Sequence, residues 1–200
     1  MPRTSRVVAA LVAAAAIATT WGAARAGSEA AGAADSEAEL AAIGLRIAPV
    51  PLDLAGRDRR LVGLGSYLVN LATCSGCHTN PEYAPGHDPF EGQKPKIDAA
   101  RYLAGGTDFG SVVSANITPD KKGRPAGLTY DRFVRAMRHG ADPDHPGRLL
   151  QVMPWPAYRD VTGHQLRAIY EYLGAIPSRP SRPVAAAAPR SVPALSAGGG

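Results

Sequence analysis

Apolar side chains recur at helical spacing in three segments of the chain, and no segment alternates convincingly as a strand would. The first segment covers residues 59–72 and has its apolar stripe at Leu61, Leu64, Leu68 and Leu71. Gly65 lies on the neighbouring face, where the missing side chain would let another helix approach closely. We therefore predict an amphipathic helix that ends just before Cys74.

The second segment follows Thr129, a residue type that often caps the N-terminus of a helix. Its apolar face comprises Tyr130, Phe133, Val134 and Met137. Arg138 and His139 place basic side chains in the last turn, and Gly140 suits the position that follows a helix. The pattern predicts a helix of about ten residues, which needs packing against the rest of the domain to be stable.

The third segment has the strongest boundary signals. Thr162 and Gln165 have the spacing of a capping box at a helix N-terminus. The apolar stripe that follows comprises Leu166, Ile169, Tyr170 and Leu173. Gly174 and Pro177 indicate where the helix ends.

More than fifty residues, 79–128, separate the first two predicted helices and are rich in Gly, Pro, Asp and Asn. A loop of this length is unusual in a compact domain unless it surrounds something. A large flat apolar cofactor would give such a loop a surface to bury against. The predicted class is therefore all-α with long loops.

The two ends of the chain differ in composition from its middle. Residues 1–26 combine Arg3 and Arg6 with an apolar run and a small-residue site at Ala24 and Ala26, which is typical of a cleaved signal peptide. Residues 27–51 and residues 178–200 are rich in Ala, Gly, Ser or Pro, and we predict a flexible segment and a flexible tail. The folded domain is then expected at residues 52–177, and the protein is expected in the periplasm.

Charge and cysteine content narrow the functional classes. Removing residues 1–26 with their three arginines leaves 19 basic against 17 acidic residues, a net charge of +2. The overall charge of +5 therefore does not indicate nucleic-acid binding. An exported protein can form disulfides, but this chain has only two cysteines, three positions apart. The two cysteines must therefore serve something other than a disulfide framework.

The two cysteines belong to the sequence Cys74-Ser75-Gly76-Cys77-His78, the C-x-x-C-H pattern of covalent haem attachment. Two thiols at this spacing can reach the two vinyl groups of a porphyrin, and the next residue then lies under the iron. A thioredoxin-like pair would need a βαβ context, and a zinc site would need a second pair of ligands. Neither is found, so we expect one covalently bound haem c with His78 as an axial ligand.

The residue on the other side of the iron decides what the haem can do, since a methionine there closes the site and favours electron transfer. Met137 falls on the apolar stripe of the second helix and is interpreted as a core residue. Met153 lies in a proline-rich segment that cannot be helix interior, so a loop can present its side chain. The remaining histidines, interpreted as solvated alternatives, are His87, His139, His145 and His164. We expect His78 and Met153 as the two iron ligands.

Several ordered motifs resemble class I c-type cytochromes, and in particular one haem domain of the cytochrome c subunits of bacterial membrane-bound alcohol and gluconate dehydrogenases. The motifs are Gly65-Ser66-Tyr67-Leu68, the haem-attachment sequence, residues 116–120, residues 133–140, and Met153-Pro154 followed by Tyr158. Together they cover about residues 60–177.

The resemblance implies a cytochrome c-like helical domain whose long loops wrap the haem. It also implies thioether bonds at Cys74 and Cys77, axial ligation by His78 and Met153, and a helix crossing marked by Gly65 and Tyr170. Residues 116–120 would line the haem pocket. The dehydrogenase subunits typically hold three such domains, whereas this chain has one motif and no internal repeat, and its residues 80–100 are longer than expected.

These observations favour a periplasmic one-electron carrier over an enzyme, because the function needs no acid, base or nucleophile. Its partners would be redox proteins such as a dehydrogenase, an oxidase or another cytochrome, bound weakly by a monomer. The basic loop of Lys121, Lys122 and Arg124 is a candidate contact, although the pattern favours a solvated turn. Two alternatives remain: a haem protein with an open sixth position that acts as a ligand sensor, reductase or peroxidase, and a subunit tethered to a dehydrogenase complex by an uncleaved N-terminus.

Overall fold

The computed structural model describes residues 35–181. The predicted signal peptide, residues 1–26, lies outside the described residues, as does most of the predicted tail. The described chain contains a helix over residues 35–47, then α2 (Arg59–Leu71), α3 (Cys74–His78), the short 3₁₀ helix η1 (Pro89–Glu91), α4 (Tyr130–His139), the 3₁₀ helix η2 (Trp155–Tyr158) and α5 (Gly163–Ala175). β-Pairing in this part of the chain is limited to isolated bridges. The all-α class is therefore confirmed.

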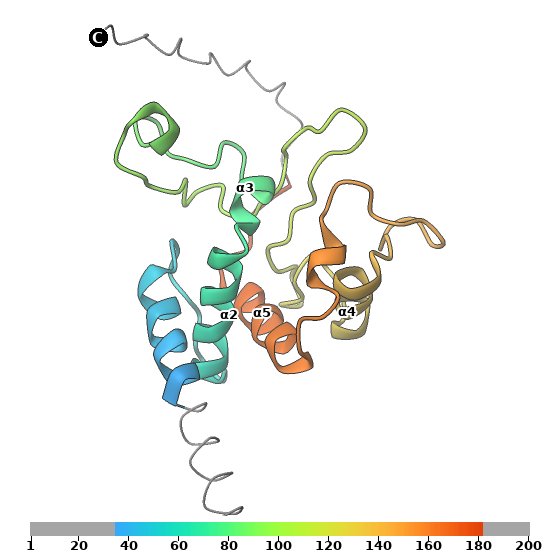
Figure 1. Ribbon diagram of the computed structural model, residues 1–200, viewed down its shortest axis with the longest axis horizontal. Coiled ribbons are helices and arrows are strands. Elements are labelled where there is room, and N and C mark those ends of the chain that lie inside the picture. Colours follow the sequence, from blue (N-terminus) through green and yellow to red (C-terminus); the bar gives the residue numbers. More distant parts are fainter. Residues whose placement is uncertain (1–34, 182–200) are drawn as a thin grey trace, which may run out of the picture.

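Helices α2 and α5 cross in direct backbone contact at the centre of the molecule (Figure 1). A Cβ atom added to Gly65 would overlap the Ala168 carbonyl and would lie 2.7 Å from the Cβ of Tyr172. The close approach predicted from Gly65 is confirmed. The residues that it meets on α5 are Ala168 and Tyr172, so the expectation that Tyr170 marks the crossing was wrong.

Tyr170 packs on the opposite side of α5, against α4. Its ring lies edge to face with those of Tyr130 and Phe133, at 5.4 Å between centroids in both pairs. Its hydroxyl donates to the Leu128 carbonyl at 2.8 Å. The aromatic side chains of the predicted stripes thus join α5 to α4, whereas Gly65 and Ala168 let α5 approach α2 closely.

The predicted helix ends agree closely with the structure. Asp58 caps α2 by accepting from the Arg60 and Leu61 amides at 2.8 and 3.2 Å. Helix α4 begins after Thr129 and ends at Gly140, whose left-handed φ of 63° favours glycine. The predicted capping box of Thr162 is present on α5, which continues one residue past Gly174 to Ala175.

Part of the segment predicted to be flexible, residues 27–51, is helical and packed. Over residues 35–47 a helix lies against α2, with Ala41 only 2% exposed. A Cβ added to Gly44 would overlap the Gly63 carbonyl, and the Ser66 hydroxyl donates to the Gly44 carbonyl at 2.7 Å. The Ala- and Gly-rich composition that suggested flexibility instead allows two helices to touch through their backbones.

The long connection of residues 79–128 is ordered by contacts of its own with the helical core. Tyr102 and Leu103 are fully buried, and the Tyr102 hydroxyl lies 2.9 Å from that of Tyr172 on α5. The buried Thr79 hydroxyl accepts from the Leu103 amide at 3.0 Å. In Figure 1 the loops of this connection flank α3, at the far end of α2. No helix among residues 35–181 is both long and apolar enough to cross a membrane.

Candidate haem-attachment site

The attachment motif forms a helix of its own, α3, directly after α2. Thr73, with a left-handed backbone conformation (φ 51°, ψ 38°), separates the two helices and redirects the chain. Cys74 and Cys77 are both partly buried, and neither forms a disulfide. Positions three apart share one face of a helix, so both thiols are available on the same side of α3.

The imidazole of His78 is held in one tautomer by the backbone. Its Nδ1 lies 2.7 Å from the Ala115 carbonyl oxygen, and because a carbonyl can only accept, Nδ1 carries the proton. Burial lowers the pKa of His78, and the hydrogen bond to Ala115 opposes this less strongly. The side chain is thus a neutral imidazole with a free lone pair on Nε2, the form in which histidine binds a metal.

Gly105 fits between the backbone of His78 and the Ala115 carbonyl. The Gly105 amide donates to the His78 carbonyl at 2.7 Å. At its φ of +71°, an added Cβ would lie 2.5 Å from the carbonyl carbon of Ala115. Gly105 and Ala115 are site residues that the sequence reasoning missed. The only local signal was the pair Gly105-Gly106 after a buried apolar run.

A carboxylate covers the polar side of α3. The Ser75 hydroxyl, in a buried residue, donates to Glu82 at 2.8 Å. A Cβ added to Gly76 would lie 3.7 Å from the same carboxylate. The start of the unexpectedly long segment, residues 80–100, is therefore tied to the attachment motif.

The Cys74 thiol does not have the properties of a reactive thiol in a redox pair. Burial raises the pKa of Cys74 to about 11, whereas reactive cysteines in C-x-x-C motifs have lowered values that favour the thiolate. The Cys74 thiol is therefore protonated at neutral pH, which disfavours thiol exchange. The donor set of Cys74, Cys77 and His78 thus fits a haem group.

The two methionines that remain after the predicted processing have different surroundings. Met137 on α4 is 7% exposed and belongs to the main core cluster, as its place on the apolar stripe predicts. Met153 lies in the loop before η2, is partly buried, and packs against the cluster that Cys74 also contacts. The assignment of Met153 as the second iron ligand stays a prediction.

Three of the four alternative histidines have partners in the protein. His87 Nδ1 lies 3.0 Å from the Lys94 carbonyl, and His145 lies 3.0 Å from Asp142. His164 pairs with Glu37 of the N-terminal helix at 3.1 Å. His139 is exposed in the last turn of α4.

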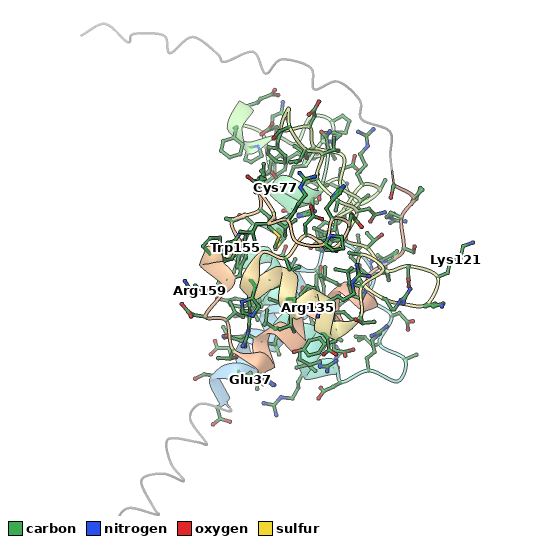
Figure 2. The ribbon with its side chains drawn as sticks, turned by 90° about the vertical axis from the view of Figure 1, so that its right-hand side faces the viewer. Glu37, Cys77, Lys121, Arg135, Trp155 and Arg159 are labelled. Atoms are coloured by element: carbon green, nitrogen blue, oxygen red, sulfur yellow. The ribbon has the colours of Figure 1, made fainter. Side chains whose placement is uncertain are left out.

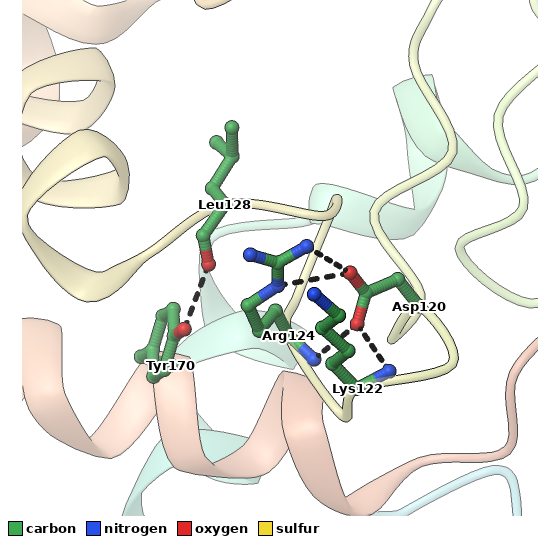
Figure 3. A network of polar contacts seen from close by, with 5 residues as sticks. All are labelled: Asp120, Lys122, Arg124, Leu128 and Tyr170. Carbon is green, nitrogen blue, oxygen red and sulfur yellow. Dashed lines mark hydrogen bonds and ion pairs between the residues drawn. The ribbon is translucent and has the colours of Figure 1, made fainter.

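The basic loop forms a closed turn around Asp120. The Asp120 carboxylate accepts from the Lys122 and Arg124 amides and from the Arg124 guanidinium, the latter at 2.7 and 2.9 Å (Figure 3). Lys121 projects from the edge of the molecule, well separated from Cys77 (Figure 2). The charge of Arg124 is thus balanced within the loop, which favours a structural interpretation of Arg124, and a contact through Lys121 and Lys122 stays a prediction.

Comparison with known proteins identifies the class of the domain. The chain is 31% identical over 138 residues to the fructose dehydrogenase cytochrome subunit of Gluconobacter japonicus, covering 67% of this chain and 25% of that protein. It is 34% identical over 112 residues to the gluconate 2-dehydrogenase cytochrome c subunit of Pantoea cypripedii, covering 56% and 22%. It is 31% identical over 119 residues to the quinone alcohol dehydrogenase cytochrome c subunit of Gluconacetobacter polyoxogenes, covering 58% and 22%.

The chain therefore resembles a c-type cytochrome domain of dehydrogenase cytochrome subunits, and the resemblance expected from its motifs is confirmed. The match spans about a quarter of the length of these relatives. No family model matches the sequence, and no solved structure matches it.

Proposed function

We propose that this protein is a one-electron carrier, a c-type cytochrome with a single covalently attached haem. The observation that carries the proposal is helix α3, which presents two free thiols and, next to them, a neutral imidazole whose Nδ1 proton is committed to Ala115. The likeness to dehydrogenase cytochrome subunits supports it.

Each residue of the proposed site has one task. Cys74 and Cys77 would hold the cofactor through thioether bonds, and His78 and Met153 would bind its iron. A bound haem would supply reversible one-electron chemistry. The Ala115 carbonyl keeps the His78 ring in the tautomer that leaves Nε2 free. No side chain is required to transfer a proton or to attack a substrate, so the protein acts as a carrier and not as an enzyme.

Spectra of the purified protein test this proposal, after expression in cells that can attach haem c. The protein should remain coloured after denaturation, because thioether bonds hold the haem. Ferric protein should show the weak near-red band of methionine-bound haem.

Met153→Leu should abolish this band, whereas the matched Met137→Leu should keep it, because Met137 is a core residue. A colourless protein would overturn the whole proposal. A band that survives in Met153→Leu would overturn only the ligand assignment. Carbon monoxide binding to the reduced parent protein would favour a ligand sensor, reductase or peroxidase with an open sixth position.

We further propose that the protein is exported to the periplasm and exchanges electrons with a dehydrogenase. Residues 1–26 have the pattern of a cleaved signal, and the relatives are named as subunits of fructose, gluconate and alcohol dehydrogenases. Sequencing the N-terminus of the mature protein tests the first part, since a start near Gly27 means that the signal is removed.

A second candidate is a permanent subunit of a dehydrogenase complex, which the names of the relatives favour. The two candidates differ in purification. A carrier should elute from a sizing column as a monomer and should be reduced by a dehydrogenase with saturable kinetics. A subunit should elute together with the flavin or quinone of its complex.

A further inference from the structure

The segment that follows α5 was predicted to be a free tail, yet its first residues bind the loop that supports His78. The Arg179 amide donates to the Thr118 hydroxyl at 3.0 Å, and the Arg179 carbonyl accepts from the Asn116 amide group at 2.7 Å. The Arg179 guanidinium also reaches the Ala99 carbonyl at 3.1 Å. These contacts contradict, at Arg179, the prediction of a flexible tail. Because they are made mainly by backbone atoms, composition could not reveal them.

The residues that Arg179 binds form a rigid turn. Asn116 Oδ1 accepts from both the amide and the hydroxyl of Thr118, at 2.9 and 2.7 Å. Thr118 is only 4% exposed, so its hydroxyl depends on these protein partners. The Ile117 amide between them donates to the Leu103 carbonyl at 3.0 Å.

This turn determines the direction of the carbonyl that accepts the His78 proton. The Ala115 carbonyl shares one planar peptide unit with the amide nitrogen and Cα of Asn116. When Asn116 is fixed, the plane of that carbonyl is fixed as well. The 2.7 Å bond from His78 Nδ1 therefore depends on the placement of Asn116, and Asn116 is bound by Arg179.

We propose that Arg179 is a positioning residue for the axial histidine: through Thr118 and Asn116 it holds the Ala115 carbonyl against His78 and so tunes the haem. This inference rests on the proposed function. A hydrogen bond to Nδ1 makes an imidazole ligand more basic, and a more basic ligand stabilises the ferric iron. Loosening the turn should therefore shift the protein toward the reduced state.

Four variants test this idea in the full-length haem protein. Thr118→Val keeps the shape of the side chain but removes its hydroxyl, and Thr118→Ser restores the hydroxyl. Arg179→Pro removes both the guanidinium and the backbone amide donor. Arg179→Ala removes the guanidinium but keeps the amide donor, so it is the matched control. The Thr118 pair tests the bonds of the hydroxyl to Asn116 and Arg179 together, and the Arg179 pair isolates the bond from the Arg179 amide to Thr118.

We expect Thr118→Val to shift the reduction equilibrium at least threefold toward the reduced form relative to Thr118→Ser, which is about 28 mV at 59 mV per tenfold change. Arg179→Pro should shift it in the same direction relative to Arg179→Ala. The His78 ring N–H of the reduced protein should exchange with D₂O at least threefold faster in the two shifted variants, as measured by NMR.

Unchanged potential and exchange in Thr118→Val would overturn the inference, even if that variant proves less stable. If Arg179→Pro fails to fold, the two Thr118 variants decide alone. A parent protein that lacks haem would overturn the proposed function together with this inference. A parent that shows a reversible one-electron wave, with variants that match it, would overturn only the role of Arg179.

Discussion

Replacing Gly105 with alanine should destabilise the protein by more than the strain of its backbone angle alone would, because the added Cβ also meets the peptide that supports His78. The added Cβ would lie 2.5 Å from the Ala115 carbonyl carbon and 2.6 Å from its oxygen, inside van der Waals contact. A residue other than glycine at a φ of +71° costs about 1–2 kcal/mol. Overpacking against a backbone group costs about 1–3 kcal/mol more. We therefore expect Gly105→Ala to lose about 2–5 kcal/mol in the free energy of unfolding.

Gly123→Ala is the matched control, because Gly123 has nearly the same φ, +73°, and an added Cβ there would meet nothing within 4 Å. It should lose only the conformational cost of about 1–2 kcal/mol. Guanidinium unfolding of the haem protein, with linear extrapolation, measures both values. If the two variants differ by less than about 0.5 kcal/mol, the reasoning about the space beside Ala115 is wrong. A displaced carbonyl should also raise the reduction potential of Gly105→Ala but not that of Gly123→Ala.

Two further variants test the helix crossing and the Asp120 turn. Gly65→Ala should lose about 1–3 kcal/mol of stability in denaturant unfolding, since its Cβ would overlap the Ala168 carbonyl, whereas Gly163→Ala has open space and should lose nothing. Hydrogen bonds from Arg124 lower the pKa of Asp120 below its ordinary value. The stabilisation that the Asp120 carboxylate contributes is therefore present above about pH 4, the pKa of this group in the unfolded chain. It is lost as the pH falls through the lower pKa of the folded protein. Asp120→Asn should be less stable than the parent at pH 7 and equally stable in strong acid, and a difference that persists in acid would contradict this.

The parts of the fold that the sequence predicted well are those specified locally. Apolar spacing and capping residues placed α2, α4 and α5 within about a residue of their observed ends. The glycine at the helix crossing was also identifiable, because a glycine inside a helix needs a packing reason. Its partner on α5 was not, since the register between two helices depends on their three-dimensional packing and leaves no mark in either segment.

The parts that sequence reasoning missed depend on contacts between residues far apart in the chain. Ala115 supports His78 from 37 positions away through a backbone atom, and any residue type would supply the same carbonyl. Arg179 likewise contacts Asn116 and Thr118 through its own backbone. The thioether role of the cysteines and the ligand role of Met153 remain predictions that the spectra will test.

The contact between Gly44 and Gly63 changes where the independently folding unit starts. If the protein is shortened to begin at residue 52, the face of α2 around Gly63 loses its covering helix, and the Ser66 hydroxyl loses its acceptor. Fusions and fragments intended to retain the proposed haem site should therefore include the chain from residue 35 onward. For the same reason, a linker to another protein is better joined upstream of that helix than next to α2.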